Sequence, residues 1–404
     1  MSAASAQAHT GPQARTLRVA TALASTLVVA ACGGAPSAPA GIAATPATSR
    51  LRTVLADSWA GYKQVFIQPD GRVVDPTRGG VTTSEGQGYA LLRAVWMGDE
   101  TTFEKVWSWT AGNLQAGAGA PFASLWSNGR IVDGDSASDA DTDIALALLY
   151  AARRFGDAQL RKDAVATLSA IWQDDVASID GMNVLTAGNW ATKQESPGPV
   201  VNPSYFAPYA YRTFAAEDPG HSWSSLVDSS YTLLDACTRA VLDGTHGAGL
   251  PPNWCAISRA TGGVVSFPTI ANADDYGYDA FRVMWRVALD AIWNDEPRAR
   301  SYLEGSAFLR AQWNSDHRLD PVYGHDGSVV SSYDDPTIYG GDLGNFAVTD
   351  PAGASQIEQV LLASFHASEP AYFGDPQNYF EQNWVWFGLA LSSGVLVDLD
   401  RGSR

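Results

Sequence analysis

Apolar residues recur at spacings of three and four along most of the chain, whereas few stretches alternate in the way that strands do. The run 51–66 is typical, because Leu55 and Trp59 fall on the same face of a helix. The chain is therefore predicted to be all-α. The same period predicts further helices at 84–96, 101–114, 141–155, 157–172, 222–242, 275–293, 296–313, 354–367 and 378–396, with a weaker one at 203–214.

The segments between these helices are predicted to be loops of one domain. Gly- and Pro-rich runs at 117–121, 195–203 and 261–268 are each flanked by predicted helices. Loops inside a compact domain have this character, so we do not interpret them as domain boundaries. The prediction is a single helical domain over residues 50–404.

The composition supports a packed core and restricts the partners. Hydrophobic residues make up 46% of the 404 residues and charged residues 17%, which excludes a disordered chain. The formal net charge is −17, and an acidic surface repels the phosphates of nucleic acids and anionic lipids. We expect a small-molecule, protein or neutral-polymer substrate and no nucleic acid as partner.

The N-terminal segment has the pattern of an export signal. Arg15 and Arg18 lead into 19–31, an uncharged run that is too short to span a bilayer. The run ends in Val-Ala-Ala-Cys-Gly at 29–33, which resembles the bacterial lipobox. That resemblance implies a signal peptide over 1–31, a lipid on the thiol of Cys32 and a flexible tether over 32–49. An ordinary signal peptide, with Cys32 incidental to it, is the alternative.

Export would allow the other two cysteines to form a disulfide, because disulfides persist outside the cytosol. Cys237 and Cys255 lie on either side of a Gly- and Pro-rich loop, so they are candidates for a disulfide. Two buried free thiols are the alternative. Neither cysteine has a second Cys or His at metal-ligand spacing, and we expect no metal site there.

Two acidic motifs stand where helices are predicted to begin. Glu85 lies in Thr-Ser-Glu-Gly-Gln-Gly at 83–88, where unpaired N–H groups and the helix dipole favour a carboxylate. It is therefore either a capping residue or a functional acid. Asp139, Asp141 and Asp143 precede a strongly apolar helix and exceed what capping requires. Such a cluster binds calcium or a polyol, and an EF-hand is disfavoured because its glycine and glutamate positions are occupied by other residues.

A third acid, Asp279, is predicted to lie inside the helix 275–293 among aromatic and apolar neighbours. Arg282 follows three residues later, on the same helix face, and the two side chains are either a buried ion pair or part of a site. Aromatic residues also stand in or near loops rich in Gly, Pro or Asn, where they suit stacking on sugar rings. They are Trp126, Trp190, Tyr205, Trp254, Tyr333 and Tyr339.

These motifs together resemble glycoside hydrolase family 8. The run 137–155, Ala-Ser-Asp-Ala-Asp-x-x-Ile-Ala-x-Ala-Leu-Leu-x-Ala-x-x-x-Phe, is similar to the signature of that family. The segment 83–89 resembles its acid-bearing motif, and 278–286 resembles its base-bearing motif. Residues 202–208, Asn-Pro-Ser-Tyr-Phe-Ala-Pro, are similar to a segment that places a tyrosine near the cleavage point. The resemblance covers roughly 55–395.

The resemblance implies an (α/α)₆ barrel of six inner and six outer helices. It implies an endo-acting hydrolase that cleaves β-1,4 linkages in cellulose, β-glucan, xylan or chitosan with inversion and without a cofactor. By the matched motifs, Glu85 is the expected general acid, Asp279 the general base and Asp139 the acid that the signature marks. We expect the substrate to contact Trp126, Tyr205, Arg282 and Tyr333.

Three alternatives stay open at this point. A non-catalytic glycan-binding lipoprotein would keep the aromatic residues, although all three acids are present here. A lyase acting on uronic polymers needs a basic groove, which the net charge disfavours. A chitosanase or xylanase of the same family is not separated from a β-1,4-glucanase by composition. We expect an exported, lipid-anchored, monomeric endoglucanase that processes a soluble exopolysaccharide.

Overall fold

Helices account for most of the residues that the computed structural model describes, which are 46–117 and 119–400. The predicted signal peptide and Cys32 lie outside the described residues. The α-helices are α1 (Pro46–Phe66), α2 (Ser84–Met97), α3 (Glu100–Asn113), α4 (Ser138–Phe155), α5 (Ala158–Ala170), α6 (Asn189–Thr192), α7 (Pro208–Glu217), α8 (Trp223–Arg239), α9 (Arg282–Asn294), α10 (Pro297–Gly305), α11 (Ala307–Asp316), α12 (Pro336–Thr349), α13 (Pro351–Ala363) and α14 (Tyr379–Ser393). Shorter helical segments are η1 (Pro76–Arg78), η2 (Ile171–Asp175) and η3 (Pro203–Tyr205).

The strands are short and stand mainly in the connections between helices. They are β1 (Thr82–Thr83), β2 (Leu125–Ser127), β3 (Arg130–Asp133), β4 (Val176–Ile179), β5 (Met182–Leu185), β6 (Val200–Val201), β7 (Val241–Leu242), β8 (Thr245–His246), β9 (Cys255–Ile257), β10 (Val264–Val265), β11 (Val322–Tyr323), β12 (Val329–Ser331), β13 (Phe365–His366) and β14 (Tyr372–Phe373). Two sheets have three strands, in the orders β1-β2-β3 and β10-β9-β6, and the other pairs are hairpins.

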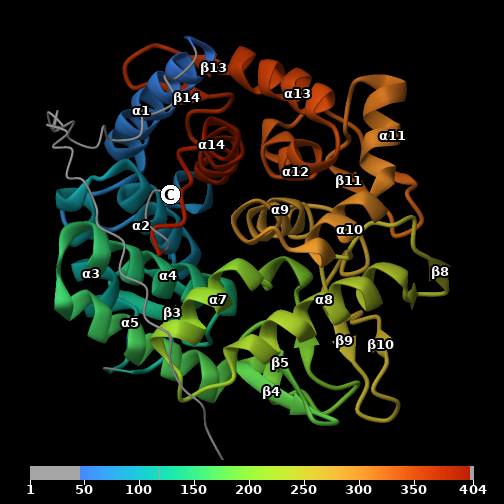
Figure 1. Ribbon diagram of the computed structural model, residues 1–404. Coiled ribbons are helices and arrows are strands. Elements are labelled where there is room, and N and C mark those ends of the chain that lie inside the picture. Colours follow the sequence, from blue (N-terminus) through green and yellow to red (C-terminus); the bar gives the residue numbers. More distant parts are fainter. Residues whose placement is uncertain (1–45, 118, 401–404) are drawn as a thin grey trace, which may run out of the picture. The chain divides into compact units, whose positions relative to one another are not determined.

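The helices form two concentric rings (Figure 1). In the inner ring α2, α4, α7, α9, α12 and α14 each contact the next helix, and α14 returns to α2. The outer helices pack on them pairwise: α3 on α2, α5 on α4, α8 on α7, α10 on α9, α13 on α12 and α1 on α14. Outer and inner helices therefore alternate along the chain. The predicted barrel of six inner and six outer helices is confirmed, with α11 as an addition beside α13.

Burial distinguishes the two rings and explains why each helix takes its place. The outer helix α3 buries an apolar stripe that includes Phe103, Val106 and Trp109, as an amphipathic surface helix does. The inner helix α2 is buried at every position except Glu85 and Met97. A helix enclosed on all sides is expected to be apolar throughout. A partly exposed carboxylate at its first turn is therefore an exception.

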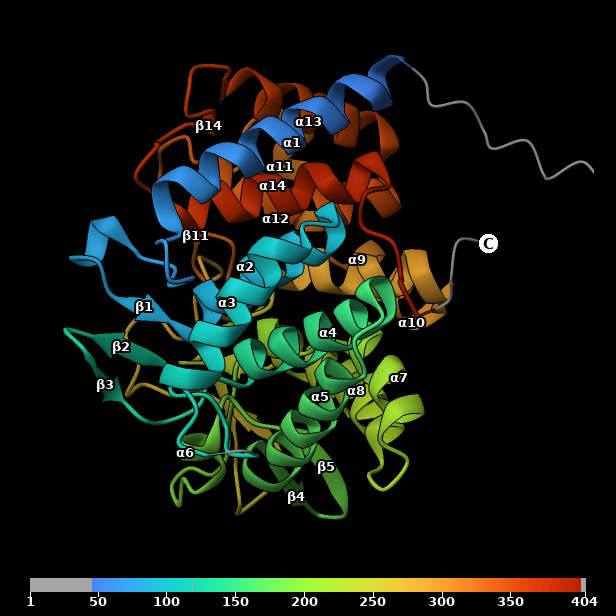
Figure 2. The ribbon, with the colours of Figure 1, turned by 90° about the vertical axis from the view of Figure 1, so that its left-hand side faces the viewer.

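Segments before the inner helices carry the small sheets. The sheet β1-β2-β3 leads into α2 and α4, and it lies at one end of these helices in Figure 2. The sheet β10-β9-β6 lies in the connections before α7 and α9. The side chains at the starts of the inner helices are thus flanked by extended segments.

Three helix predictions need correction. The predicted helix 296–313 is two helices, α10 and α11, separated at Ser306. The predicted helix 275–293 begins only at Arg282, so Asp279 lies in the turn before α9 and not inside a helix. The reason is that the backbone of Tyr276 pairs with Tyr323 as an isolated β-bridge. The third correction concerns α12, which the sequence pattern did not predict at all.

Cys237 of α8 and Cys255 of β9 are joined by a disulfide, with their Cα atoms 6.7 Å apart. Both residues are fully buried. Within residues 46–117 and 119–400, the helices are all too short or too polar to cross a membrane.

Candidate active site

Arg282, the first residue of α9, is the centre of a cluster of three carboxylates. Its Nη1 donates to Glu85 Oε2 and to Asp139 Oδ2, at 3.0 Å each, and its Nη2 donates to Asp279 Oδ1. The Arg282 side chain is 2% exposed. A guanidinium cannot be neutralised in a protein and presents donors in a fixed fork. It therefore holds three like-charged groups in one fixed arrangement.

The carboxylates come from three inner helices that are far apart in the sequence. Glu85 lies in the first turn of α2, which Thr83 caps by accepting from the N–H of Gly86 at 3.0 Å. Asp139 lies in the first turn of α4. Asp279 lies three residues before Arg282, in the turn that leads into α9. The predicted acids are thus brought together because the inner helices begin at the same end of the barrel.

The three acids differ in exposure. The side chain of Asp139 is 2% exposed, that of Glu85 23% and that of Asp279 30%. Burial raises the pKa of Asp139 to about 7, repulsion from Glu85 adds to the effect, and Arg282 opposes it. The buried acid therefore binds a proton close to neutral pH, while the other two acids face an opening.

Glu85 has a second partner that sequence reasoning missed. The hydroxyl of Tyr379, the first residue of α14, donates to Glu85 Oε1 at 2.6 Å. Burial, with the adjacent Glu85 carboxyl, raises the pKa of Tyr379, so this hydroxyl keeps its proton and acts as the donor. Glu85 is therefore held from two sides, by Arg282 and by Tyr379.

Asp279 receives donors from side chains outside its own segment. Asn202 Nδ2 donates to Oδ1 and Trp254 Nε1 donates to Oδ2, both at 3.0 Å. Together with Arg282 they fix both oxygens of the carboxylate. The segment 202–208 was singled out in the sequence for its tyrosine, whereas nothing in the sequence marked Asn202 as a partner of Asp279.

A cavity of about 340 Å³ opens over this cluster. Its lining includes Glu85, Asp279 and Arg282, together with Tyr278, Tyr379 and Phe380. Asp139 is 2% exposed and does not line the cavity, although it accepts from the same Arg282 nitrogen as Glu85. A ligand in the cavity would meet two carboxylates that share one guanidinium.

The predicted aromatic residues take different places. The Tyr205 ring lies 5.3 Å from Arg282 Cζ, and Trp254 packs edge-on against Tyr205. Tyr333 is half exposed, and its hydroxyl lies 2.6 Å from that of Tyr278 in the cavity wall. Tyr333 is thus accessible beside the cavity, whereas Tyr205 keeps only 9% of its surface exposed.

Of the other predicted aromatic residues, Trp126 and Trp190 lie in or near the strands before the inner helices, and Tyr339 lies in the core. Trp126 of β2 pairs across the sheet with Thr82, just before Glu85, with the Arg72 guanidinium over its ring. Trp190 packs against Trp254. Tyr339 is a core residue of α12 and packs against Trp313, so it does not belong to the site.

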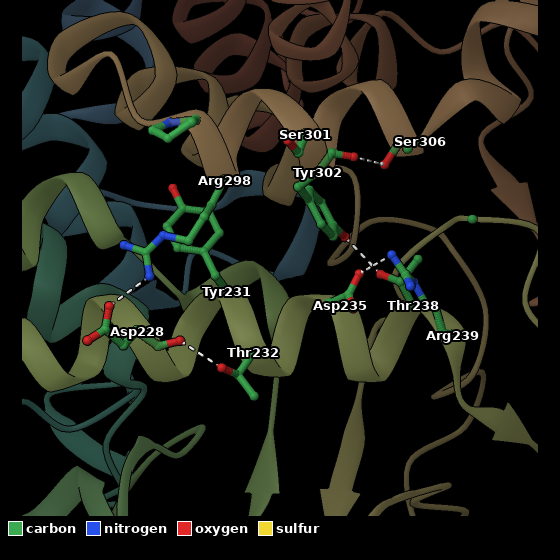
Figure 3. A pocket seen from close by; sticks show the side chains of 13 residues that line it. Asp228, Tyr231, Thr232, Asp235, Thr238, Arg239, Arg298, Ser301, Tyr302 and Ser306 are labelled. Carbon is green, nitrogen blue, oxygen red and sulfur yellow. Dashed lines mark hydrogen bonds and ion pairs between the residues drawn. The ribbon is translucent and has the colours of Figure 1, made fainter.

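A larger cavity, of about 620 Å³, lies elsewhere, between α8 and α10 (Figure 3). Arg298 lies over the ring of Tyr231 and pairs with Asp228, and the Tyr302 hydroxyl bonds to Thr238. The labelled charged side chains of this groove thus already have partners in the protein. Its size alone does not make it a site, because it lacks the convergent acids of the smaller cavity.

Comparison with known proteins agrees with this geometry. The family model of glycosyl hydrolases family 8 matches residues 38–385. The probable endoglucanase of Novacetimonas hansenii is 33% identical over 266 residues, which are 63% of this chain and 72% of that protein. Endoglucanase A of Acetivibrio thermocellus is 29% identical over 267 residues, 63% of this chain and 52% of that protein. The chain thus matches about half the length of the latter relative.

Solved structures share the fold. The structure of endo-beta-1,4-glucanase CMCax from Acetobacter xylinum matches with a TM-score of 0.68 at 23% identity, covering 85% of this chain and 99% of that chain. A beta-1,3-1,4-glucanase from Paenibacillus sp. X4 matches with a TM-score of 0.75 at 21% identity, covering 87% and 93%. The family model matches most of this chain, and the three acidic motifs converge on Arg282. This chain therefore belongs to glycosyl hydrolases family 8.

Proposed function

We propose that this protein is an endo-acting, inverting hydrolase of β-1,4-glucan. The observation that carries the proposal is the pair Glu85 and Asp279, two carboxylates on different helices that face one cavity and are held by different nitrogens of Arg282. Hydrolysis with inversion needs a proton for the leaving oxygen and, across the sugar, a base for the attacking water. The names of the relatives support a glucan substrate.

In this proposal Glu85 is the general acid. Its Oε1 accepts from Tyr379 and its Oε2 from Arg282, so the carboxyl group has a fixed orientation towards the cavity. A positioned acid of this kind contributes roughly 10²–10⁴-fold to the rate. The leaving oxygen of the glycosidic bond would take its proton from the protonated form of this carboxyl group, in which one Glu85 oxygen donates instead of accepting.

Asp279 is the proposed general base. Arg282, Asn202 and Trp254 all donate to its carboxylate, and hydrogen bonds to the charged form favour that form. An ionised, oriented carboxylate can accept a proton from a water molecule that attacks the anomeric carbon. Inversion also requires the two carboxyl groups to stand roughly 6.5–9.5 Å apart, which leaves room for that water.

The other predicted residues have supporting roles in this proposal. Asp139, which is 2% exposed and accepts from Arg282, helps to fix the guanidinium, and Arg282 in turn holds Glu85 and Asp279 in place. Trp126, Tyr205 and Tyr333 contact sugar rings along the cleft, since aromatic faces suit the apolar faces of pyranose rings.

The test is the release of reducing sugar by residues 50–404 from carboxymethylcellulose, barley β-glucan, xylan and chitosan, with Glu85→Gln beside the wild type. We expect glucan cleavage that the substitution reduces by at least about 100-fold, because an amide is not acidic enough to protonate the leaving oxygen. Cleavage of xylan or chitosan alone would keep the mechanism and replace the substrate. Binding of oligosaccharide without any cleavage would favour the glycan-binding alternative.

We also propose that the protein is exported and anchored by a lipid on Cys32, where it processes a soluble exopolysaccharide. Support comes from the run 19–31 and the lipobox-like Val-Ala-Ala-Cys-Gly at 29–33. In cells fractionated after labelling with a fatty acid, the wild type should carry label in the membrane fraction and Cys32→Ser should carry none. A labelled Cys32→Ser protein would contradict the anchor, and an unchanged secreted polysaccharide after gene deletion would contradict the role.

A further inference from the structure

The sheet β10-β9-β6 supplies two of the three side chains that hold Asp279. Asn202 directly follows β6, and Trp254 directly precedes β9. The two strands are neighbours, with Val201 paired to Cys255. Both donors therefore stand at the same end of two neighbouring strands, and their spacing is fixed by the backbone hydrogen bonds between those strands.

The residue before Trp254 holds the backbone of the turn that carries Asp279. Asn253 Oδ1 accepts from the backbone N–H groups of Gly277, Asp279 and Ala280, at 3.2, 3.3 and 3.0 Å. Its Nδ2 donates to the carbonyl of Asn272 at 3.0 Å. α9 has no side-chain cap, and the N–H groups of Arg282 and Val283 donate to the carbonyls of Asp279 and Ala280. The Asn253 amide therefore holds the turn before the helix and not the helix end itself. Asn253 thus sets the path of the chain, and Trp254 sets the orientation of the carboxylate.

The next residue along the chain ties this pair to the barrel. Cys255 is bonded to Cys237 in the outer helix α8. Asn253, Trp254 and Cys255 are consecutive, so the covalent link lies one residue from the donor to Asp279. The disulfide restrains β9 relative to α8. It therefore also restrains the contacts that Asn253 and Trp254 make with Asp279.

We propose that Asn253 and Trp254 are positioning residues for Asp279 and that the Cys237–Cys255 disulfide is their anchor. The inference rests on the proposed role of Asp279 as the base. A base must point a lone pair at one water molecule, and a misplacement of about 1 Å can cost on the order of 100-fold in rate. The disulfide therefore supports catalysis through the loop, in addition to any effect on stability.

The first test is Trp254→Phe, which keeps an aromatic ring and removes the N–H that donates to Asp279. We expect kcat to fall about tenfold with KM within about twofold, since one hydrogen bond to a charged group is lost. The matched control is Trp313→Phe in α11, which also removes an indole N–H bond to a side-chain oxygen, that of Gln356 at 2.8 Å. It should leave kcat unchanged.

A second substrate separates the base from the acid. A 2,4-dinitrophenyl β-cello-oligosaccharide has a leaving group that departs without protonation, so its hydrolysis depends on the base alone. Trp254→Phe should slow this substrate by the same factor as a natural cello-oligosaccharide. A general structural defect would change KM as well as kcat. Equal rates for Trp254→Phe and the wild type on both substrates would overturn the role of Trp254.

The anchor is tested by the double variant Cys237→Ala/Cys255→Ala, assayed well below its melting temperature. We expect a folded protein with kcat lowered about tenfold and KM nearly unchanged. Asn253→Ser, which replaces the amide that accepts from three N–H groups by a shorter hydroxyl, should do the same in a protein with the disulfide intact. If the double variant does not fold, Cys237→Val/Cys255→Ala, which refills more of the buried volume, replaces it. Wild-type kcat in the disulfide-free protein would overturn the anchor.

The same assays distinguish this inference from the proposed function. A wild-type protein that cleaves no β-1,4-glycan overturns both. An active wild type whose kcat is unaffected in Trp254→Phe and Asn253→Ser overturns only the positioning roles.

Discussion

Arg282 organises the site at the scale of single residues. The fork of one buried guanidinium reaches Glu85, Asp139 and Asp279. Each acid is held by a charge-assisted hydrogen bond, the stronger class of hydrogen bond in proteins. The three acids differ in exposure: Asp139 is buried, and the other two are open to the cavity.

Tyr379→Phe tests the orientation of Glu85. The substitution removes the hydroxyl that donates to Glu85 Oε1 and leaves the ring in place. We expect kcat on a natural cello-oligosaccharide to fall about tenfold, which corresponds to one hydrogen bond. On a 2,4-dinitrophenyl glycoside, which needs no acid, we expect no change.

The control is Tyr302→Phe, which loses a hydroxyl that bonds to Thr238 at 2.9 Å between α8 and α10. Its kcat should equal that of the wild type on both substrates. Equal slowing of Tyr379→Phe on both substrates would mean that Tyr379 does not act through the acid.

The sequence could identify the acids but not the contacts between them. Motif resemblance singled out Glu85, Asp139 and Asp279, because their neighbours in the chain carry the pattern. Tyr379 is 294 residues from its partner Glu85. Contacts at such separations depend on how the inner helices close into a ring, which no local pattern contains.

At the scale of elements, α12 is the longest helix that the sequence pattern did not predict. It contains Gly340, Gly341 and Gly344, and glycine disfavours a helix in isolation. The fold explains them by close packing. A Cβ on Gly340 would lie 2.3 Å from the carbonyl oxygen of Trp384, and a Cβ on Gly344 would lie 2.5 Å from that of Met284. Tertiary contact with α14 and α9 therefore overrides the local preference.

Gly344→Ala tests this packing. The new methyl group would press on the backbone of α9, so we expect the free energy of unfolding to fall by about 1–3 kcal/mol. Chemical denaturation measures the change.

The control for that measurement is Gly112→Ala in α3, where a Cβ meets nothing within 4 Å. There we expect a gain of roughly 0.5–1 kcal/mol, because alanine favours the helix and restricts the unfolded chain. A neutral Gly344→Ala would show that the helices can separate without cost.

At the scale of the whole molecule, buried acids should set the pH dependence of stability. Burial raises the pKa of Asp139 and of Asp175 to about 7 and that of Asp342 to about 8. In the unfolded chain an aspartate titrates near a pKa of about 3.9. Between about pH 4 and pH 7 the folded state therefore binds protons that the unfolded state has released.

The sign follows from that difference. Because the folded state binds more protons in this window, the free energy of unfolding falls as pH rises, by at most about 1.4 kcal/mol per pH unit for each group. We expect melting temperatures to decrease steadily from pH 5 to pH 8. Asp342→Asn should make the decrease shallower. A melting temperature that rises over this range, or a variant as steep as the wild type, would contradict the assignment.

The fold itself was largely predictable at this scale. Alternating helices with three- and four-residue periods, and the family resemblance, were enough to predict an all-α barrel of six inner and six outer helices. The boundary before α9 was not predictable, since it depends on the pairing of Tyr276 with Tyr323 and on the side chain of Asn253.

The stereochemistry of the first product tests the central claim most directly. Proton NMR of a soluble cello-oligosaccharide, recorded as the wild type begins to cleave it, shows which anomer of the new reducing end appears before mutarotation. Inversion at a β-1,4 linkage, with Asp279 activating water opposite Glu85, predicts the α-anomer first. The β-anomer first would mean retention, which requires a nucleophilic carboxylate and contradicts the proposed pair of acid and base.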